Sequence, residues 1–211
     1  MSQIFQTILT YLPNTTPLTS NITTTMSSLP TTLSDPNYAS TPLTLPRLGL
    51  ALLRLAPLII SSGSLMCAWD QQNAFGSFLT PPLLAKPGHL SAHVVVDWFA
   101  AYARPTKWVI FLGYPLALAF SFINAFTAAG DGLHPQTRTF YALGGVLSIL
   151  HFYFGAYSMM WNARISTKTN VGKANEDALR GWLGNNGTRM VVVNLPAWVL
   201  FICATATFVR V

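Results

Sequence analysis

The sequence predicts an all-α membrane protein, a bundle of four transmembrane helices preceded by a disordered Ser/Thr/Pro-rich tail. About half of the 211 residues are apolar and only 9% are charged, against roughly a quarter in an ordinary soluble domain. The few charges are separated by long uncharged gaps, and about 20 mostly apolar residues suffice to cross a bilayer as a helix. None of these stretches has the charged face that a helix of a soluble bundle needs.

The uncharged gaps give the positions of the spans. They run between residues 54 and 70, 107 and 131, 138 and 164, and 189 and 210. The first gap is long enough only when Arg54 is counted inside the helix. The predicted spans are residues 48–68, 108–128, 140–161 and 190–208, so the transmembrane domain covers residues 47–211.

The predicted tail covers residues 1–46, which contain eighteen Ser/Thr, six Pro and the single charge of Asp35. Such a segment cannot bury enough apolar surface to offset its chain entropy, so we expect it to be disordered. Asn14-Thr15-Thr16 and Asn21-Ile22-Thr23 are acceptor sequences for N-glycosylation, which predicts a glycoprotein if the tail is lumenal. Tripeptides of this kind also arise by chance. A third one, at Asn186, falls in a predicted cytoplasmic loop.

The net charge of +6 does not indicate nucleic acid, because no basic cluster is interleaved with the stacking aromatic residues of single-strand binders. Lys and Arg accumulate in cytoplasmic loops, and eight lie in the first and third loops against three on the other side. We therefore expect these loops in the cytoplasm and both termini outside or in the lumen of an endomembrane such as the endoplasmic reticulum. The eight are Lys86, Arg104, Lys107, Arg164, Lys168, Lys173, Arg180 and Arg189; the three are Arg47, Arg138 and Arg210.

Both long loops contain a predicted helix. Residues 90–103 have no Pro or Gly and carry apolar side chains at helical spacing. This pattern predicts an amphipathic helix at the membrane interface, ended by Arg104-Pro105. In the third loop, Asn175-Glu176-Asp177 precedes a short predicted helix at residues 178–183, which leads into the last span.

One face of the third span carries polar and small residues three or four positions apart. A stripe of small residues can let two helices approach closely. His151 near the middle of the span is equally a candidate base, because imidazole titrates near neutral pH. The residues of this face are Gly144, Ser148, His151, Gly155, Ser158 and Asn162.

Two further groups have alternative interpretations. Arg54 lies two turns inside the first span, where its side chain can extend back to the lumenal surface or hold an anionic oxygen inside the bundle. His93 and Asp97 share a face of the first-loop helix and can hold a divalent metal, although a wet polar face of an interfacial helix is the favoured interpretation. No phosphate-binding or dinucleotide-binding motif is present, so no cofactor is evident.

Three motifs together resemble the anthrone oxygenase family of small four-span membrane proteins. Trp98 and Tyr102 lie in the long first loop, and Trp161-Asn162-Ala163-Arg164 closes the third span. Trp182, Asn186 and Arg189 lie at relative positions 0, +4 and +7 and open the fourth span. The resemblance covers residues 48–208, and the sequence departs from the family pattern in lacking a Pro just before Asn162.

The resemblance implies a monooxygenase that oxidises an anthrone-type aromatic polyketide to an anthraquinone with O2, without a cofactor. It implies a base, His151, with Arg164, Arg189 or Arg54 holding an anionic oxygen. Asn162 and Asn186 would orient the substrate, whereas simple anchoring at the membrane interface is the alternative for both Asn/Arg motifs. A non-catalytic scaffold of the same pathway is the competing function. The walls of the substrate site would be Phe152, Tyr153, Trp161 and Trp182.

Overall fold

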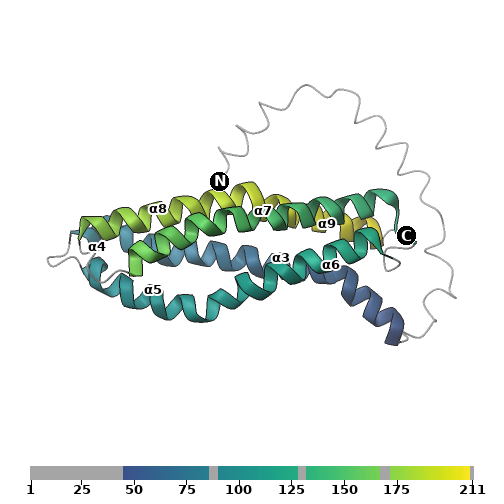
Figure 1. Cartoon of the computed structure of the whole chain (residues 1–211), viewed down its shortest axis with the longest axis horizontal. Helices are drawn as coiled ribbons and strands as arrows, with labels where there is room; N and C mark the ends of the chain where they lie inside the picture. Colours follow the sequence, from purple (N-terminus) through teal and green to yellow (C-terminus); the bar gives the residue numbers. More distant parts are fainter. Residues whose placement is uncertain (1–44, 86–89, 128–131, 167–171, 210–211) are drawn as a thin grey trace, which may run out of the picture. The chain divides into compact units, whose positions relative to one another are not determined.

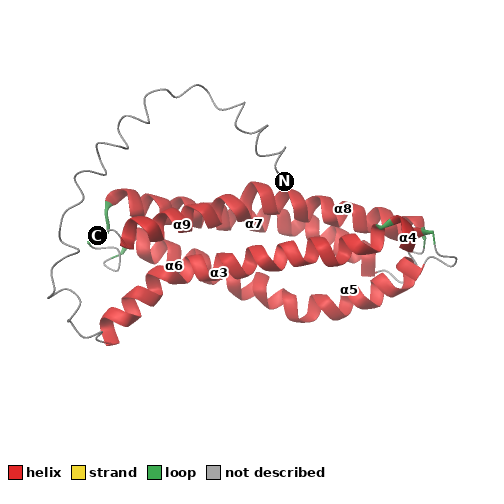
Figure 2. Ribbon diagram, turned by 180° about the vertical axis from the view of Figure 1, so that it is seen from behind, coloured by secondary structure: helices red, strands yellow, loops and turns green. Residues whose placement is uncertain are grey.

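The computed structural model describes residues 45–85, 90–127, 132–166 and 172–209, and these form helices that pack into a bundle (Figures 1 and 2). The first long helix, α3, is Leu45–Gly76. After the short helices η2 (Ser77–Leu79) and α4 (Pro81–Leu84), α5 (Leu90–Trp108) continues through the π-helical segment η3 (Val109–Gly113) into α6 (Tyr114–Phe126). The third is α7 (Pro135–Ser166). The fourth comprises α8 (Lys173–Arg189), the π-helical segment η5 (Met190–Asn194) and α9 (Leu195–Val209).

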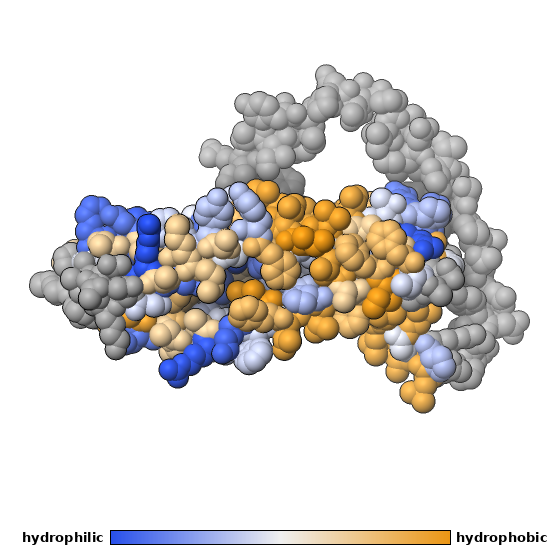
Figure 3. Space-filling view, viewed as in Figure 1, coloured by the Kyte–Doolittle hydropathy of each residue, from blue (hydrophilic) through white to orange (hydrophobic). Residues whose placement is uncertain are grey.

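Four of these helices are long and apolar enough to cross a membrane, which confirms the predicted fold class. The predicted tail lies outside the described residues, apart from its last two. The candidate spans have 32 to 35 residues, or about 50 Å at 1.5 Å per residue, against a hydrocarbon core of about 30 Å. Figure 3 shows where the excess lies: apolar side chains cover the part formed by α6 and α9, and hydrophilic ones gather at the end near α4. We therefore expect the bundle to extend beyond the bilayer on that side.

The predicted end of the first-loop helix at Arg104-Pro105 is wrong. Helix α5 passes through Pro105 and is continuous with the second span. Pro105 removes one N–H donor, and the helix continues past it through η3 into α6. The amphipathic segment is thus the extension of a span and not a separate interfacial helix.

The third loop is also shorter than predicted. Helix α8 begins at Lys173, after Gly172 with its positive φ of 67°, and runs without a break into the last span. Helix α8 is polar, and the sequence pattern predicts that a span starts where the apolar residues begin. The continuous helix was therefore not predicted. The polar helix matters because it carries Trp182, Asn186 and Arg189 on a rigid element.

The membrane half of the bundle is held by close packing around α7. A Cβ atom on Gly144 would lie 2.7 Å from Cζ of Phe201 in α9, and one on Gly145 would lie 2.8 Å from Cε1 of Phe122 in α6. Both glycines therefore permit a close helix approach, as predicted for Gly144. The phenol of Tyr141 donates a hydrogen bond of 2.7 Å to the carbonyl of Arg54 and ties α7 to α3.

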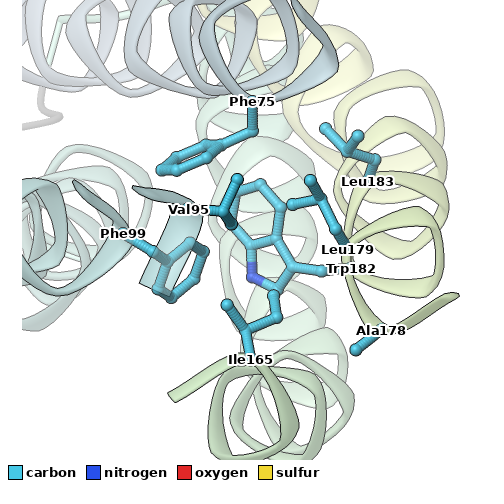
Figure 4. Close-up of a cluster of buried hydrophobic side chains, with 8 residues drawn as sticks. All are labelled: Phe75, Val95, Phe99, Ile165, Ala178, Leu179, Trp182 and Leu183. Atoms are coloured by element: carbon cyan, nitrogen blue, oxygen red, sulfur yellow. The ribbon is translucent and has the colours of Figure 1, made fainter. Parts of the chain in front are cut away.

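The projecting half has its own apolar cluster (Figure 4). The indole of Trp182 from α8 lies at its centre, and Phe75 from α3 and Phe99 from α5 contact that indole edge-on, with ring centroids 5.3 and 5.4 Å away. Ile165 closes the cluster from α7. Four helices are thus fixed around one indole. The buried members are Phe75, Val95, Phe99, Ile165, Ala178, Leu179, Trp182 and Leu183.

Candidate functional site

A cavity of about 390 Å³ lies among α3, α5, η3, α7 and α8. Six aromatic side chains line it, together with the polar groups of seven residues, which include one imidazole and one buried guanidinium. The volume falls in the usual range for small-molecule sites. The aromatic residues are Phe75, Phe99, Tyr102, Phe111, Phe152 and Trp182, and the polar ones are Gln71, Thr106, Lys107, His151, Ser158, Asn162 and Arg189.

Helix α7 supplies one long side of the cavity, from His151 through Gly155 and Ser158 to Asn162. These residues belong to the polar face predicted from the sequence. Eleven positions separate His151 from Asn162, so this side is about 16 Å long at 1.5 Å per residue. The cavity therefore suits an elongated or flat molecule that lies along α7.

His151 lies at the membrane end of the cavity and is only 1% exposed. Its ring stacks on that of Tyr114, with centroids 3.3 Å apart and planes at 24°. Its Nδ1 atom lies 3.4 Å from Oδ1 of Asn194. When Nδ1 carries the proton, it donates to Asn194 and leaves the lone pair of Nε2 as the acceptor. The imidazole is therefore oriented by one contact from α6 and one from η5.

Arg189 is the buried cation of the cavity, with 5% of its surface exposed. Its Nη2 group donates to Oδ1 of Asn186. The amide nitrogen of Asn186 in turn donates to the carbonyl of Ala68 at 3.0 Å and to Oε1 of Gln72 at 3.1 Å. Asn186 thus lies behind the cavity, where it fixes Arg189 against α3.

The charge of Arg189 is not balanced by a carboxylate of the cavity. None of the residues that line it is Asp or Glu, and within the described helices the Nε atom of Arg189 is buried without a hydrogen-bond partner. Burying a cation at membrane depth costs free energy that only a partner recovers. Oδ1 of Asn162 is likewise buried without a partner in this part of the chain. The Nε atom of Arg189 can therefore donate a further hydrogen bond, and the Oδ1 atom of Asn162 can accept one.

Two π-helical segments place the polar residues of the membrane end. Tyr114 follows η3 directly, Arg189 precedes η5, and Asn194 ends η5. Such segments recur at functional sites because the wider turn re-aims side chains. Each is followed two positions later by a proline, Pro115 and Pro196. A proline ring clashes with the carbonyl four residues earlier, which gives a physical cause for the widened turn.

The predicted site residues fall into three groups. His151, Phe152, Asn162, Trp182 and Arg189 line the cavity together. Asn186 lies one contact behind it, bonded to Arg189. Four others are not among the lining residues: Arg54, Tyr153, Trp161 and Arg164.

The positions of these four have separate reasons. Arg54 lies in the part of α3 that contacts Tyr141, two turns before Ser61 toward the start of α3. Tyr153 is two residues from His151, about 200° around the helix; it is 63% exposed, next to Tyr157. The ring of Trp161 packs on Gly181, where a Cβ atom would lie 2.6 Å away. Arg164 is exposed, with its guanidinium 4.8 Å from the centroid of Trp161.

The structure does not test the alternative metal site of His93 and Asp97. The side chain of His93 lies outside them, and Asp97 is exposed on α5. Among residues 45–85, 90–127, 132–166 and 172–209, no three His, Cys, Asp or Glu side chains come together. A metal ion in the cavity would be bound by the imidazole of His151, which lies beside Asn194.

Sequence reasoning did not assign Tyr114, Gln71 or Asn194 to the site. Tyr114 stacks on His151, and Gln71 is a buried residue that lines the cavity from α3. Pro115 and Pro196 could have drawn attention to Tyr114 and Asn194, because a proline inside a span disturbs the turn that precedes it. Gln71 gave no such signal, because a glutamine at the predicted end of a span is ordinary.

Fold and cavity define a class: a four-span membrane protein with a buried polar centre in an aromatic-lined cavity. Comparison with curated proteins adds relatives. The epoxidase gkaX of Penicillium citrinum is 31% identical over 163 residues, which are 75% of this chain and 95% of gkaX. The probable epoxidase scpX of Mollisia scopiformis is 29% identical over 153 residues, 72% of this chain and 93% of scpX. The oxaleimides biosynthesis cluster protein N of Penicillium oxalicum is 27% identical over 160 residues, 75% of this chain and 90% of that protein.

The chain belongs to the family of small fungal membrane proteins of secondary-metabolite biosynthesis that includes gkaX. No protein-family model matches the chain, and no solved structure matches it. Two of these relatives are named as an epoxidase (gkaX) and a probable epoxidase (scpX), and none of the three is named as an anthrone oxygenase. The resemblance drawn from the Trp/Asn/Arg motifs is therefore confirmed only at the coarser level of oxidative enzymes of secondary metabolism.

Proposed function

We propose that the protein is a membrane-bound oxygenase of secondary metabolism that epoxidises a carbon–carbon double bond of a largely apolar substrate held in the 390 Å³ cavity. The observation that carries this proposal is the placement of His151 and Arg189 in one aromatic-lined cavity, in a family with members named as epoxidases. Beside an apolar slot, a buried base can transfer protons and a buried cation can stabilise a negatively charged oxygen.

The reaction must balance in electrons. One atom of O2 enters the double bond as the epoxide oxygen, and the other leaves as water. This needs two electrons and two protons, which we assign to a two-electron reductant of the nicotinamide or reduced-flavin class supplied from outside the chain. The protein's own part is to bind the substrate, exclude water and manage protons and charge.

The site residues take distinct roles in this proposal. His151, held by Tyr114 and Asn194, transfers a proton through Nε2. Arg189, fixed by Asn186, holds a negatively charged oxygen. Asn162 offers its unpaired Oδ1 atom to a hydroxyl or N–H group of the substrate.

A second candidate reaction is the oxidation of an anthrone to an anthraquinone. The six aromatic side chains around the cavity favour it, because they can stack on a flat tricyclic molecule. This reaction needs no outside reductant: the CH2 group becomes a carbonyl, and O2 supplies the new oxygen and leaves water. His151 would remove the proton from that carbon, and Arg189 would hold the enolate oxygen.

Gene deletion in the organism of origin identifies the substrate without guessing it. The deletion strain should accumulate a metabolite that lacks one oxygen atom relative to the final product. Microsomes that contain the wild-type chain should convert that metabolite in the presence of O2 and reductant, and His151→Ala microsomes should lose most of the conversion. Equal conversion by wild-type and empty microsomes would reject the enzymatic function. A deletion phenotype rescued in full by folded His151→Ala would favour a scaffold.

A further inference from the structure

One wall of the cavity is open to the surroundings of the bundle. Phe111 of η3 and Phe152 and Met159 of α7 line the cavity, yet they are 62%, 44% and 65% exposed. Figures 1 and 2 both show the α5–η3 region bowing away from the other helices. Because apolar side chains on the outside of a spanning bundle face lipid, this wall opens toward the bilayer.

Gly155 lies within the same wall, and the space beside its Cα atom is empty. It lines the cavity, and a Cβ atom built on it would meet nothing within 4 Å. This distinguishes it from Gly144 on the same helix face, which is pressed against Phe201. The small residue at position 155 therefore leaves a gap between α7 and η3 rather than a helix contact.

The two charged residues among those that line the cavity, Lys107 and Arg189, are both positive. Lys107 lines the cavity at its exposed rim and lies 5.2 Å from the ring centroid of Trp108, a pairing typical of the membrane–water interface. Arg189 lies inside and has an unpaired Nε atom among the described residues. No Asp or Glu lines the cavity. An anion is therefore attracted electrostatically first to Lys107 at the interface and then to Arg189 in the desolvated interior.

We propose that the substrate enters sideways from the bilayer, between η3 and α7, and that it is an amphiphile whose acidic group binds Arg189 as an anion. The proposal deepens the function proposed above, since it names the substrate class and assigns the anionic oxygen at Arg189 to the substrate. The apolar part then lies along α7 between Phe152 and Trp182, where His151 can reach it.

Photolabelling tests the binding without any turnover. The chain is reconstituted in phosphatidylcholine nanodiscs with a photoactivatable C16 fatty acid that carries a diazirine on its chain, or with the matched C16 alcohol. We expect the acid to label peptides that contain residues 106–111 and 151–162, at least tenfold more than the alcohol does. Equal labelling by acid and alcohol, or labelling confined to other helices, would overturn the proposal.

Paired variants locate the entrance and the anion site. Gly155→Leu should reduce this labelling at least fivefold, whereas Gly63→Leu, at an exposed glycine of α3 that is also free of neighbours, should leave it unchanged. Arg189→Gln should remove the preference for the acid, and Arg180→Gln, on the exposed face of α8, should keep it. Wild-type labelling in Gly155→Leu would reject the lateral entrance even if Arg189→Gln folded poorly.

A phospholipid headgroup could supply the same anion, so the nanodiscs are also prepared with phosphatidylserine. Labelling that persists in phosphatidylserine supports a free amphiphile as the occupant, and labelling abolished by it would overturn that assignment. Because the readout is covalent capture, a chain that binds the acid but oxygenates nothing would reject the proposed function and leave this inference standing.

Discussion

Gly144 and Gly155 lie on one face of α7 but differ in what surrounds them. Gly144→Ala would place its Cβ atom 2.7 Å from Cζ of Phe201, an overpacking that costs about 1–3 kcal/mol. Gly155→Ala meets no neighbour and gains up to about 1 kcal/mol of helix propensity. We expect the unfolding temperature in detergent, followed by gel filtration, to fall for Gly144→Ala and to stay equal or rise for Gly155→Ala. A fall for both would contradict the open wall at Gly155.

Asn186 is expected to act through Arg189. Asn186→Ala removes the acceptor for the guanidinium and the bonds to Ala68 and Gln72, which we expect to cost about 1–3 kcal/mol of stability and at least about tenfold in oxygenation rate. The matched control is Asn185→Ala, which loses bonds to α7 instead. If Asn185→Ala lowered the microsomal rate as much as Asn186→Ala, the positioning role would be wrong.

Among individual residues, the sequence predicted the side of the cavity formed by α7 but not the position of Arg189 from α8. Spacing of three and four residues is enough to place His151 and Asn162 on one face, because both lie on the same helix. The same geometry excludes Tyr153, only two residues from His151. The approach of Arg189 to that face depends on how α8 packs on α3 and α7, and no periodicity within one helix contains that information.

The π-helical segments η3 and η5 are the elements that shape the membrane end of the site. Pro196→Ala restores a backbone N–H and removes the clash with the carbonyl of Val192, which lets η5 relax toward α-helix. We expect the protein to become more stable, by up to about 3 kcal/mol, and to lose activity as Asn194 moves away from His151. Unfolding temperature and microsomal rate, measured together, check both directions.

Pro57→Ala is the control for that prediction. Pro57 also lies inside a long helix, α3, but the residues before it form regular α-helix. Its replacement should change stability with little effect on activity. Unaltered activity in Pro196→Ala would mean that the widened turn has no part in placing the site.

The presence of the four spans was easier to predict than the way two of them continue into neighbouring helices. All four spans could be read from the uncharged gaps. The joins α5–η3–α6 and α8–η5–α9 could not, because Arg104-Pro105 and the polar stretch of α8 resemble helix ends locally. In both cases packing around Trp182 in the projecting half stabilises helix that local propensity leaves undecided.

The whole molecule has a predicted orientation. Helix α3 begins and α9 ends at the same end of the bundle, opposite the end formed by α4 and the start of α8 (Figure 1). We expect the tail in the lumen, so that Asn14 and Asn21 carry glycans. Treatment with endoglycosidase should then shift the wild-type band on a gel and leave the Asn14→Gln/Asn21→Gln double variant unchanged.

Asn186 offers an internal control for this orientation. It lies in the third acceptor sequence, but it is 1% exposed within α8 and is hydrogen-bonded to α3. A glycan on Asn186, or a wild-type band that does not shift, would contradict a lumenal tail and cytoplasmic loops.

The central claim is that the cavity along α7 is where oxygen from O2 enters the substrate. The direct measurement uses 18O2 and microsomes supplied with reductant and the metabolite that accumulates in the deletion strain. We predict that wild-type microsomes add one 18O atom to that metabolite, and that His151→Ala and Gly155→Leu add little, although both remain monodisperse on gel filtration. Product oxygen that comes from water, or full 18O incorporation by both variants, would contradict the account.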